Sequence, residues 1–382
     1  MTMQLDAFDA AAFLRDHWQK QPLLIRNPWV KWRNPLDPDE LAGLACEGGI
    51  ESRLVRQLRS GLKVEQGPFL AARFGKPGSA PWTLLVQAVD HSVPDVAALI
   101  DPFRFVPNWR IDDVMVSFAT DGGGVGAHFD QYDVFLIQGL GQRRWQIGAP
   151  CDAATNLKPH EDLRLLAEFE PTEEWVLDPG DILYLPPRIA HNGIAVGDDC
   201  MTYSIGFRAP ARSELIAHYC DHLLSQLPED DRYADPDLVL AANPGEIPPA
   251  ALTRLRGMIA EMIADDAGFA RWFGTYSSAP KYPDIDWKPN ASLNADKVIK
   301  RLARGVRLRR NPASRFAFIQ RADAAVTLFV NGELFECAGP AARLAQHLCG
   351  STSTPIADDM TADTPCIALI TNLYNQGHIE FD

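Results

Sequence analysis

Short apolar runs broken by glycine and proline dominate the first 210 or so residues of the chain. Alternation with a period of two in such runs predicts β-strands. The predicted strands are Leu23–Ile25, Leu54–Leu58, Trp82–Gln87, Asp113–Ala119, Asp133–Gln138, Arg144–Gly148, Glu174–Leu177, Ile182–Leu185 and Met201–Arg208. We expect Gly139–Gly141 to join two of them as a hairpin. Many short strands with such turns predict a β-barrel or a double-sheet jelly roll.

Three segments of the same part have a helical spacing of apolar residues instead. They are Ala7–Gln19, for which Asp6 is the expected cap, Asp37–Cys46 and Val93–Leu99.

The pattern becomes helical after Pro210. We expect one helix at Ser213–Leu227 with Ser213 as its N-cap, an acidic loop at Pro228–Pro236, and a second helix within Pro248–Phe273. Two helices without a strand between them predict a helical subdomain.

A linker at Ser277–Pro289 leads to a last part of mixed character, with the turn dipeptide Asn331-Gly332. The expected helices are Asp296–Arg304, Gly339–Cys349 and Pro365–Leu373, and the expected strands are Phe316–Gln320, Thr327–Val330 and Gly377–Phe381. Helices that end in a small hairpin resemble a winged helix. The predicted division is therefore residues 1–210, 211–276 and 277–382.

Composition and charge narrow the class of protein. The 382 residues carry a formal net charge of −14, which argues against wholesale binding to nucleic acid or anionic membrane. We find no run of 18 apolar residues and no secretory signal at the N-terminus. The seven scattered cysteines, without a C-x-x-C pair, are typical of free thiols in a reducing cytoplasm.

The candidate chemistry lies in Gly122–Trp145 and in Pro179–His191. The first stretch contains His128 and Asp130, and the second delivers His191. In a strand, residues i and i+2 point to the same face, so the His-x-Asp pair can converge on one ion. A histidine from a neighbouring antiparallel strand would complete a facial triad, which binds Fe(II) and leaves positions open for a co-substrate and dioxygen. The alternative is two unrelated histidines of a β-domain. The turn and strand pattern around all three residues favours the metal site.

Two arginines follow the candidate site on the same predicted strand region. Arg143 and Arg144 are adjacent, so one should face into the barrel and one outward. An inward arginine requires an anion to offset its desolvation, and a dicarboxylate ligand would supply one. The alternative places both on the surface.

Two further motifs could bind phosphate or nucleic acid, but each also has an ordinary structural interpretation. The Gly122–Gly126 loop lacks the G-x-G-x-x-G form and the lysine of phosphate-binding loops, so we interpret it as a tight turn that admits substrate to the metal. Lys297–Arg310 contains seven basic residues and no acid, as a nucleic-acid-binding helix would. The absence of interleaved aromatic residues and the acidic chain favour a solvated basic helix face.

The motifs resemble those of one family. GGGVGAHFDQYDVFLIQGLGQRRW at Gly122–Trp145, NWRIDD at Asn108–Asp113 and PGDILYLPPRIAHNGIA from Pro179 look like the bacterial ribosomal oxygenases of the JmjC/cupin superfamily. The opening FLRDHWQKQPLLIRN is also similar to that family's start. The likeness covers about the first 210 residues well.

The resemblance implies a double-stranded β-helix that uses Fe(II), 2-oxoglutarate and dioxygen. It assigns the metal ligands to His128, Asp130 and His191. It also assigns Arg143 to the far carboxylate of 2-oxoglutarate and Ser117 to a further co-substrate contact.

The same resemblance implies hydroxylation of an arginine of large-subunit ribosomal protein sixteen by a cytoplasmic homodimer. It places the dimer contact in the helical part, and it implies a winged-helix end that serves protein-substrate binding. Two alternatives stay open. One is a same-fold enzyme with another substrate, a histidyl hydroxylase or methyl-lysine demethylase. The other is a ligand-sensing cupin that regulates transcription through its winged helix.

Overall fold

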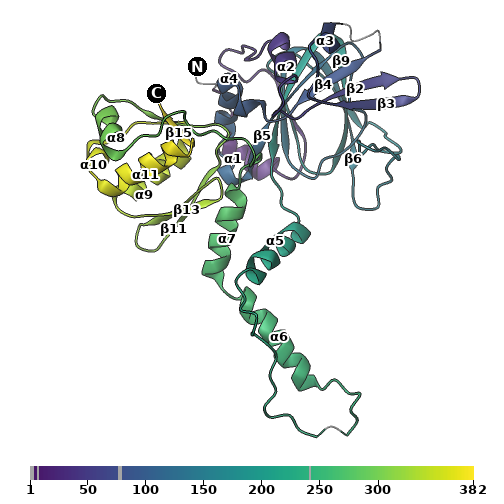
Figure 1. The fold of residues 1–382 in the computed structure, drawn as a ribbon. Coiled ribbons are helices and arrows are strands. Elements are labelled where there is room, and N and C mark those ends of the chain that lie inside the picture. Colours follow the sequence, from purple (N-terminus) through teal and green to yellow (C-terminus); the bar gives the residue numbers. More distant parts are fainter. Residues whose placement is uncertain (1–3, 7, 76–79, 241) are drawn as a thin grey trace. The chain divides into compact units, whose positions relative to one another are not determined.

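The computed structural model describes residues 4–6, 8–75, 80–240 and 242–382. The chain divides into two compact units (Figure 1). The first comprises Met1–Ala209 with Asn311–Ala313, and the second comprises Pro210–Arg310 with Ser314–Asp382.

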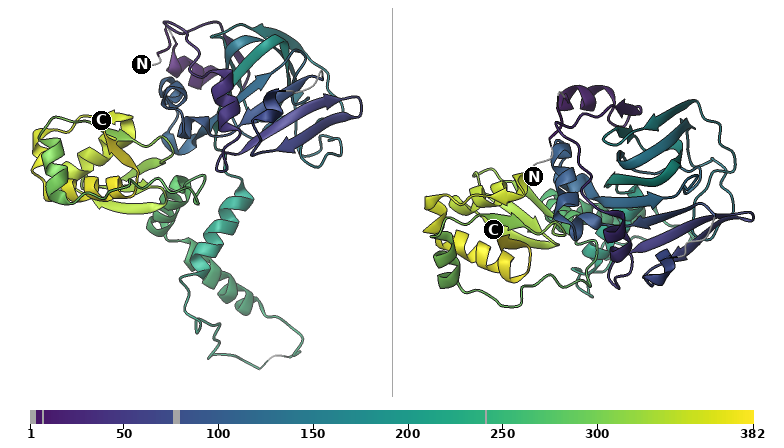
Figure 2. Two further views of the ribbon diagram at one scale, coloured as in Figure 1. Left: turned by 45° about the horizontal axis from the view of Figure 1, so that its top comes forward. Right: turned by 90° about the horizontal axis from the view of Figure 1, so that it is seen from above.

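The first unit is built on one large antiparallel sheet that curls on itself (Figures 1 and 2). Its strand order is β1-β8-β6-β9-β5-β4-β2-β3, and β7 also pairs with β6. The strands are β1 (Leu23–Ile25), β2 (Ser52–Leu58), β3 (Gly61–Gln66), β4 (Trp82–Val86), β5 (Ile111–Ala119), β6 (Val134–Pro150), β7 (Glu173–Leu177), β8 (Ile182–Leu185) and β9 (Ile189–Phe207). The predicted mainly-β jelly-roll class is confirmed.

The sheet of this barrel carries apolar side chains on both its outer and its inner face. Phe135 and Tyr203 point outward into a large core that also includes Phe13 of α1 (Ala10–Asp16). Leu136 and Trp145 point the other way, into a smaller cluster in the barrel. The alternation of side chains along β6 and β9 therefore decides which residues reach the interior.

The predicted hairpin at Gly139–Gly141 is wrong. β6 runs through this segment as one strand, and β9 pairs with both of its halves. The register shifts between Gln138 and Leu140 and again between Leu140 and Gln142, which is the mark of β-bulges. A Cβ on Gly139 would lie 2.6 Å from the Tyr203 ring, so glycine is needed here for close packing across the sheet rather than for a chain reversal.

Strand β3 escaped the sequence prediction because it is polar. It pairs along its whole length with β2, and Gly61 with a φ of 119° opens it. Its outer position in the sheet leaves half of its side chains exposed, so it lacks the apolar run that marked the other strands.

Two predicted helix caps differ from the structure. α1 is capped by Asp9, whose carboxylate accepts a hydrogen bond from the Ala12 N–H at 2.9 Å, and not by Asp6. Ala7, the predicted helix start, lies outside the described residues. Ser213 lies inside the first turn of α5 (Arg212–Leu224), because Glu214 accepts the N–H of the cap residue Ala211 at 2.9 Å. The other α-helices of the first unit are α2 (Pro38–Leu44), α3 (Ala72–Gly75) and α4 (Pro94–Ala97), and Val89–His91, Ala98–Phe103 and Asn108–Arg110 are short 3₁₀ helices.

The second unit begins with three helices and ends in a mixed domain. The predicted helix within Pro248–Phe273 is two helices, α6 (Pro249–Ile263) and α7 (Asp266–Ser278), because Asp265 caps a new helix through the N–H of Gly268. The remaining helices are α8 (Ala295–Leu302), α9 (Pro340–Gly350), α10 (Asp358–Thr361) and α11 (Thr364–Asn375).

Two three-stranded sheets complete the mixed domain. One has the order β11-β12-β13 and the other β14-β10-β15. Their strands are β10 (Leu308–Arg310), β11 (Phe316–Gln320), β12 (Val326–Val330), β13 (Glu333–Cys337), β14 (Ser353–Thr354) and β15 (Ile379–Phe381). Asn331 and Gly332 turn the chain between β12 and β13 with φ values of 47° and 85°, as the dipeptide predicts. In the described part of the chain, no helix combines the length and apolarity that a membrane span requires.

Candidate metal centre

The three candidate ligands come together at one end of the barrel interior. His128 lies in the segment between β5 and β6, and His191 is the third residue of β9. Each donates its backbone N–H to the carbonyl of the other, at 3.0 and 2.8 Å. This exchange is an isolated bridge, so His128 and Asp130 do not lie in a regular strand as expected. In the glycine-rich run before His128, Gly122 donates its N–H to the Ala195 carbonyl at 3.0 Å, and Ala195 donates its N–H to the Gly123 carbonyl at 2.9 Å.

The side chains nevertheless converge. One ligand atom from each of His128, Asp130 and His191 lies within 4.8 Å of the others. The Nε2 of His191 is 3.7 Å from Oδ2 of Asp130, and the two imidazole centroids are 4.3 Å apart. Two imidazoles and one carboxylate at these separations fit a single divalent ion with open positions on its far side.

Backbone carbonyls orient both imidazoles. Nδ1 of His128 is 2.9 Å from the carbonyl of Gly126, and Nδ1 of His191 is 2.9 Å from that of Ile189. A carbonyl can only accept, so each Nδ1 carries a proton in these contacts. In the neutral tautomer that these contacts favour, Nε2 of each ring is the atom that can bind an ion.

The electrostatics keep His191 neutral. Burial, followed by the proximity of His128, lowers the pKa of His191 to about 4, and the Asp130 charge opposes this only in part. The neutral imidazole is the form that binds a metal ion.

The Arg143 side chain points from β6 into the barrel interior, and hydrogen bonds hold one edge of its guanidinium group. It is only 4 % exposed, whereas Arg144 lies partly on the surface. Nε of Arg143 donates to the Thr202 hydroxyl at 3.0 Å, and Nη1 lies 3.5 Å from the Gly193 carbonyl. The Thr202 hydroxyl in turn donates to Oε1 of Gln138 at 3.1 Å.

The remaining guanidinium nitrogen of Arg143, Nη2, is buried and has no hydrogen-bond acceptor among the described residues. A buried cationic donor without a partner is costly, so its presence here indicates an anionic ligand.

Ser117 lies close to this arrangement. It is 7 % exposed and stands directly opposite Thr202 in the β5–β9 register. The sequence prediction missed the roles of Thr202, which accepts from Arg143, and of Gln138, which accepts from Thr202. Their strands could be predicted, but the register that brings Thr202 to Arg143 is a long-range property.

A cavity of about 660 Å³ opens beside the site. Gly122, Gly124 and Gly126 line it together with Asn192 and Ile194, which follow His191 on β9. A Cβ on Gly124 would lie 2.5 Å from the Gly193 carbonyl, so the loop needs glycine to approach the strand that closely. The cavity thus lies against the glycine-rich loop and against the β9 positions that alternate with His191, and none of the three candidate ligands lines it.

Tyr132 adds a neutral hydroxyl near the carboxylate ligand. Desolvation, followed by the charges of Asp130 and Asp113, raises the pKa of Tyr132. A protonated phenol is a hydrogen-bond donor, so Tyr132 can donate to Asp130. The sequence prediction did not single it out.

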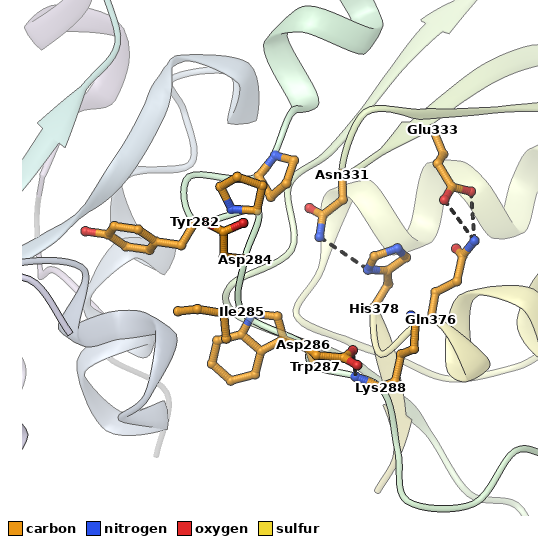
Figure 3. Close-up of a pocket in the computed structure, with 12 residues that line it drawn as sticks. Tyr282, Asp284, Ile285, Asp286, Trp287, Lys288, Asn331, Glu333, Gln376 and His378 are labelled. Carbon is orange, nitrogen blue, oxygen red and sulfur yellow. Dashed lines mark hydrogen bonds between the residues drawn. The ribbon is translucent and has the colours of Figure 1, made fainter. Parts of the chain in front are cut away.

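The second unit has its own pocket, of about 380 Å³ (Figure 3). Figure 3 shows Gln376 donating to both carboxylate oxygens of Glu333, at 3.0 and 2.8 Å. It also shows the amide of Asn331 donating to Nδ1 of the buried His378 at 3.3 Å. An amide nitrogen can only donate, so Nδ1 of His378 accepts this hydrogen bond and carries no proton.

This environment makes the stability of the second unit depend on pH. Burial lowers the pKa of His378 below its ordinary value of about 6.5, with Glu333 opposing. The unfolded chain takes up the proton first as pH falls. The His378 contribution is therefore complete above about pH 6.5 and is lost as pH falls toward the folded pKa. Opening free energies of β12 amides, from hydrogen exchange on the full chain, should fall over this range. His378→Gln should flatten the fall, and the same change at the exposed His347 should not.

The basic run Lys297–Arg310 is engaged largely within its own domain. Arg301 lies over the rings of Tyr374 and Phe381, and Arg309 pairs with Glu380 at 2.6 Å. Arg307 donates to Ser353, and the buried Arg310 lies over the Phe316 ring. These contacts support a structural role for the basic residues.

A barrel of this topology, with two histidines and an aspartate converging at its mouth and an arginine inside, defines a cupin-type oxygenase scaffold. Comparison with known families agrees: residues 98–215 match the JmjC domain, and residues 261–380 match the ROXA-like winged helix. The ribosomal protein uL16 3-hydroxylase of Escherichia coli (strain K12) is 41% identical over 293 residues, which are 77% of this chain and 78% of that protein.

Solved structures extend the likeness to the whole chain. The X-ray structure of E. coli YcfD superposes with a TM-score of 0.89 at 36% identity and covers 100% of both chains. A structure of YcfD, described as a ribosomal oxygenase, in complex with cobalt and 2-oxoglutarate has a TM-score of 0.86, again at 36% identity, over 100% of this chain and 99% of the other. The chain belongs to the JmjC-domain ribosomal oxygenases, and the predicted family and C-terminal winged helix are confirmed.

Proposed function

We propose that this protein is an Fe(II)- and 2-oxoglutarate-dependent oxygenase that hydroxylates an arginine side chain of ribosomal protein uL16. The observation that carries the proposal is the convergence of His128, Asp130 and His191 within 4.8 Å, beside a buried arginine whose Nη2 lacks an acceptor. The E. coli relative is named for hydroxylation of uL16, and YcfD has been solved with 2-oxoglutarate.

Each residue has a distinct role in this proposal. When bound, Fe(II) with 2-oxoglutarate and dioxygen supplies the oxidising chemistry that puts one oxygen atom into a C–H bond, with succinate and carbon dioxide as the other products. His128, Asp130 and His191 hold the metal through Nε2 and carboxylate oxygens. Arg143 pairs with the far carboxylate of 2-oxoglutarate, and Ser117 contacts the same molecule. The apolar barrel interior around Leu136 excludes water.

The charge of the chain suits a basic substrate. Ribosomal proteins that contact RNA are cationic, and a protein of formal net charge −14 attracts them over long range. The glycine-rich loop that lines this cavity directly precedes His128, and we propose that a substrate side chain approaches the metal past this loop. We also propose a cytoplasmic location, because the proposed substrate is a ribosomal protein and ribosomes are found there.

Ribosomes from strains with and without the gene test the substrate. Mass spectrometry of uL16 should show one arginine heavier by one oxygen atom only when the gene is present. An identical uL16 mass in both strains would remove uL16 as the substrate. A mass difference on a histidine or a methylated lysine of another protein would favour the same-fold alternatives.

The DNA-binding regulator remains the alternative of another class. It requires the basic residues of Lys297–Arg310 to face DNA, whereas four of them contact the protein's own domain. Succinate release that depends on iron and 2-oxoglutarate, with no DNA retardation, would exclude it.

We further propose that residues 211–276 form a dimerisation region. In the sequence it follows the catalytic domain, 1–210, and precedes the winged-helix domain, 277–382. α6 has no buried residue, and Figure 1 shows it extending from the rest of its unit. Large apolar side chains on and before it are exposed, namely Leu238, Val239, Leu240, Ile247, Leu252, Leu255, Ile259 and Ile263. Leu252, Leu255, Ile259 and Ile263 lie on one side of α6, and we expect a second copy of the chain to cover this apolar stripe.

A charge on this face should separate the protomers. Ile259 is 67% exposed, and in a dimer Ile259→Glu would bury an unpaired carboxylate. We expect the variant to elute as a monomer of about half the mass in light scattering. Thr253→Glu adds the same charge on the polar side of α6 and should leave the dimer intact. A wild-type chain that is monomeric at micromolar concentration would contradict the assignment.

A further inference from the structure

A second buried donor lies beside Arg143 and is also without a partner. Trp145 is two residues further along β6 and so faces the same interior. It is 6 % exposed, and its Nε1 finds no acceptor among the described residues. An indole N–H that is buried usually has a hydrogen-bond partner, so its isolation requires an explanation.

The strand opposite holds the indole in place. Trp145 faces Gly193 directly in the β6–β9 register. A Cβ on Gly193 would lie 2.7 Å from carbons of the six-membered indole ring, so only glycine lets the ring lie against β9. Neighbouring apolar side chains of the interior cluster pack around it, including Leu136 and Ile147. The indole therefore occupies a defined position.

That position spans the two ends of the co-substrate site. The indole centroid is 5.9 Å from the His191 ring and 5.8 Å from the guanidinium carbon of Arg143. The indole is thus close to both groups that would hold the two ends of a dicarboxylate, the metal ligand His191 and Arg143. Its far carboxylate has more acceptor sites than one guanidinium nitrogen can fill.

We propose that the indole N–H of Trp145 is a second hydrogen-bond donor to the far carboxylate of bound 2-oxoglutarate. The inference rests on the proposed function. Arg143 supplies the charge, and Trp145 supplies a neutral donor whose direction is set by the packing against Gly193. The pair together would favour a dicarboxylate over 2-oxoacids that end in a methyl group.

Ligand binding to the Mn(II)-loaded full-length protein, followed by water proton relaxation, tests the proposal without turnover. Trp145→Phe removes the donor and keeps an aromatic ring. A hydrogen bond to a charged group predicts that it weakens 2-oxoglutarate binding about 10- to 100-fold. Binding of 2-oxopentanoate, which has a methyl group in place of the far carboxylate, should stay within about twofold.

Trp82→Phe is the matched control. Trp82 is also buried, at 8 % exposure, and its Nε1 also lacks a partner, but it lies on β4 in the outer core. We expect this variant to bind 2-oxoglutarate as the wild type does. Equal weakening of both oxoacids by Trp145→Phe, or none of either, would overturn the inference. Failure of the wild type to bind 2-oxoglutarate with Mn(II) would instead overturn the proposed function.

A spectroscopic measurement observes the indole N–H in the wild type itself. The indole N–H resonance of Trp145, assigned by its absence from Trp145→Phe, should move downfield when 2-oxoglutarate is added to the Zn(II)-loaded wild type. It should not move with 2-oxopentanoate. An unmoved resonance at saturating 2-oxoglutarate would show that the indole does not donate to the ligand.

Discussion

Asp130→Ala is expected to reduce iron-dependent 2-oxoglutarate turnover to background. The carboxylate is the only anionic member of the candidate triad, and its Oδ2 is 3.7 Å from Nε2 of His191. Loss of residues that merely support metal ligands costs 10- to 100-fold in affinity or activity, so loss of a ligand should cost at least about 100-fold in metal affinity. His128→Ala should behave in the same way.

Metal affinity and succinate release should be measured together for these variants. Asp162→Ala, at an exposed position of the same unit, is the control and should match the wild type. An Asp130→Ala protein that still decarboxylates 2-oxoglutarate at the normal rate would refute the ligand assignment.

Arg143→Met is expected to weaken 2-oxoglutarate binding by about 100- to 4,000-fold. Removing one partner of a buried ion pair costs about 3 to 5 kcal/mol, and the guanidinium here is 4 % exposed. Arg143→Lys should recover only part of the loss, because an ammonium group cannot both donate to Thr202 and fork onto a carboxylate. The effect should appear in the KM for 2-oxoglutarate more than in the KM for the protein substrate.

The neighbouring arginine provides the control for this prediction. Arg144→Met changes the same charge on the outer side of β6 and should alter the KM for 2-oxoglutarate by less than about threefold. Equal effects at Arg143 and Arg144 would mean that overall charge, and not a specific pair, attracts the co-substrate.

The convergence of the three candidate metal ligands could be predicted because it depends largely on local sequence. A His-x-Asp spacing after a glycine-rich turn places two side chains together whether or not the backbone is a regular strand. The third residue, His191, was found by the strand and turn signals around it. The structure brings all three together through the His128–His191 bridge, although not through the strand alternation expected.

What depends on register could not be predicted. Thr202 anchors Arg143, and Gly193 makes room for Trp145, only because β9 pairs with β6 in one particular alignment. Gly139–Gly141 was interpreted as a turn because glycine pairs serve turns and bulges alike, and the choice is made by the partner strand.

The helical region shows a different limit of what can be predicted from the sequence. Leu252, Leu255 and Ile259 have the spacing of a core-facing stripe, yet all three are exposed in the single chain. An amphipathic pattern reports that a face must be covered, but not whether the chain itself or a second copy covers it.

Incubation of the purified protein with uL16, Fe(II) and 2-oxoglutarate tests the central claim most directly. The account predicts that the intact mass of uL16 rises by one oxygen atom, that tandem mass spectrometry places it on an arginine, and that the gain disappears without iron or with Asp130→Ala. An unchanged uL16 mass, under conditions in which the protein consumes 2-oxoglutarate, would contradict it.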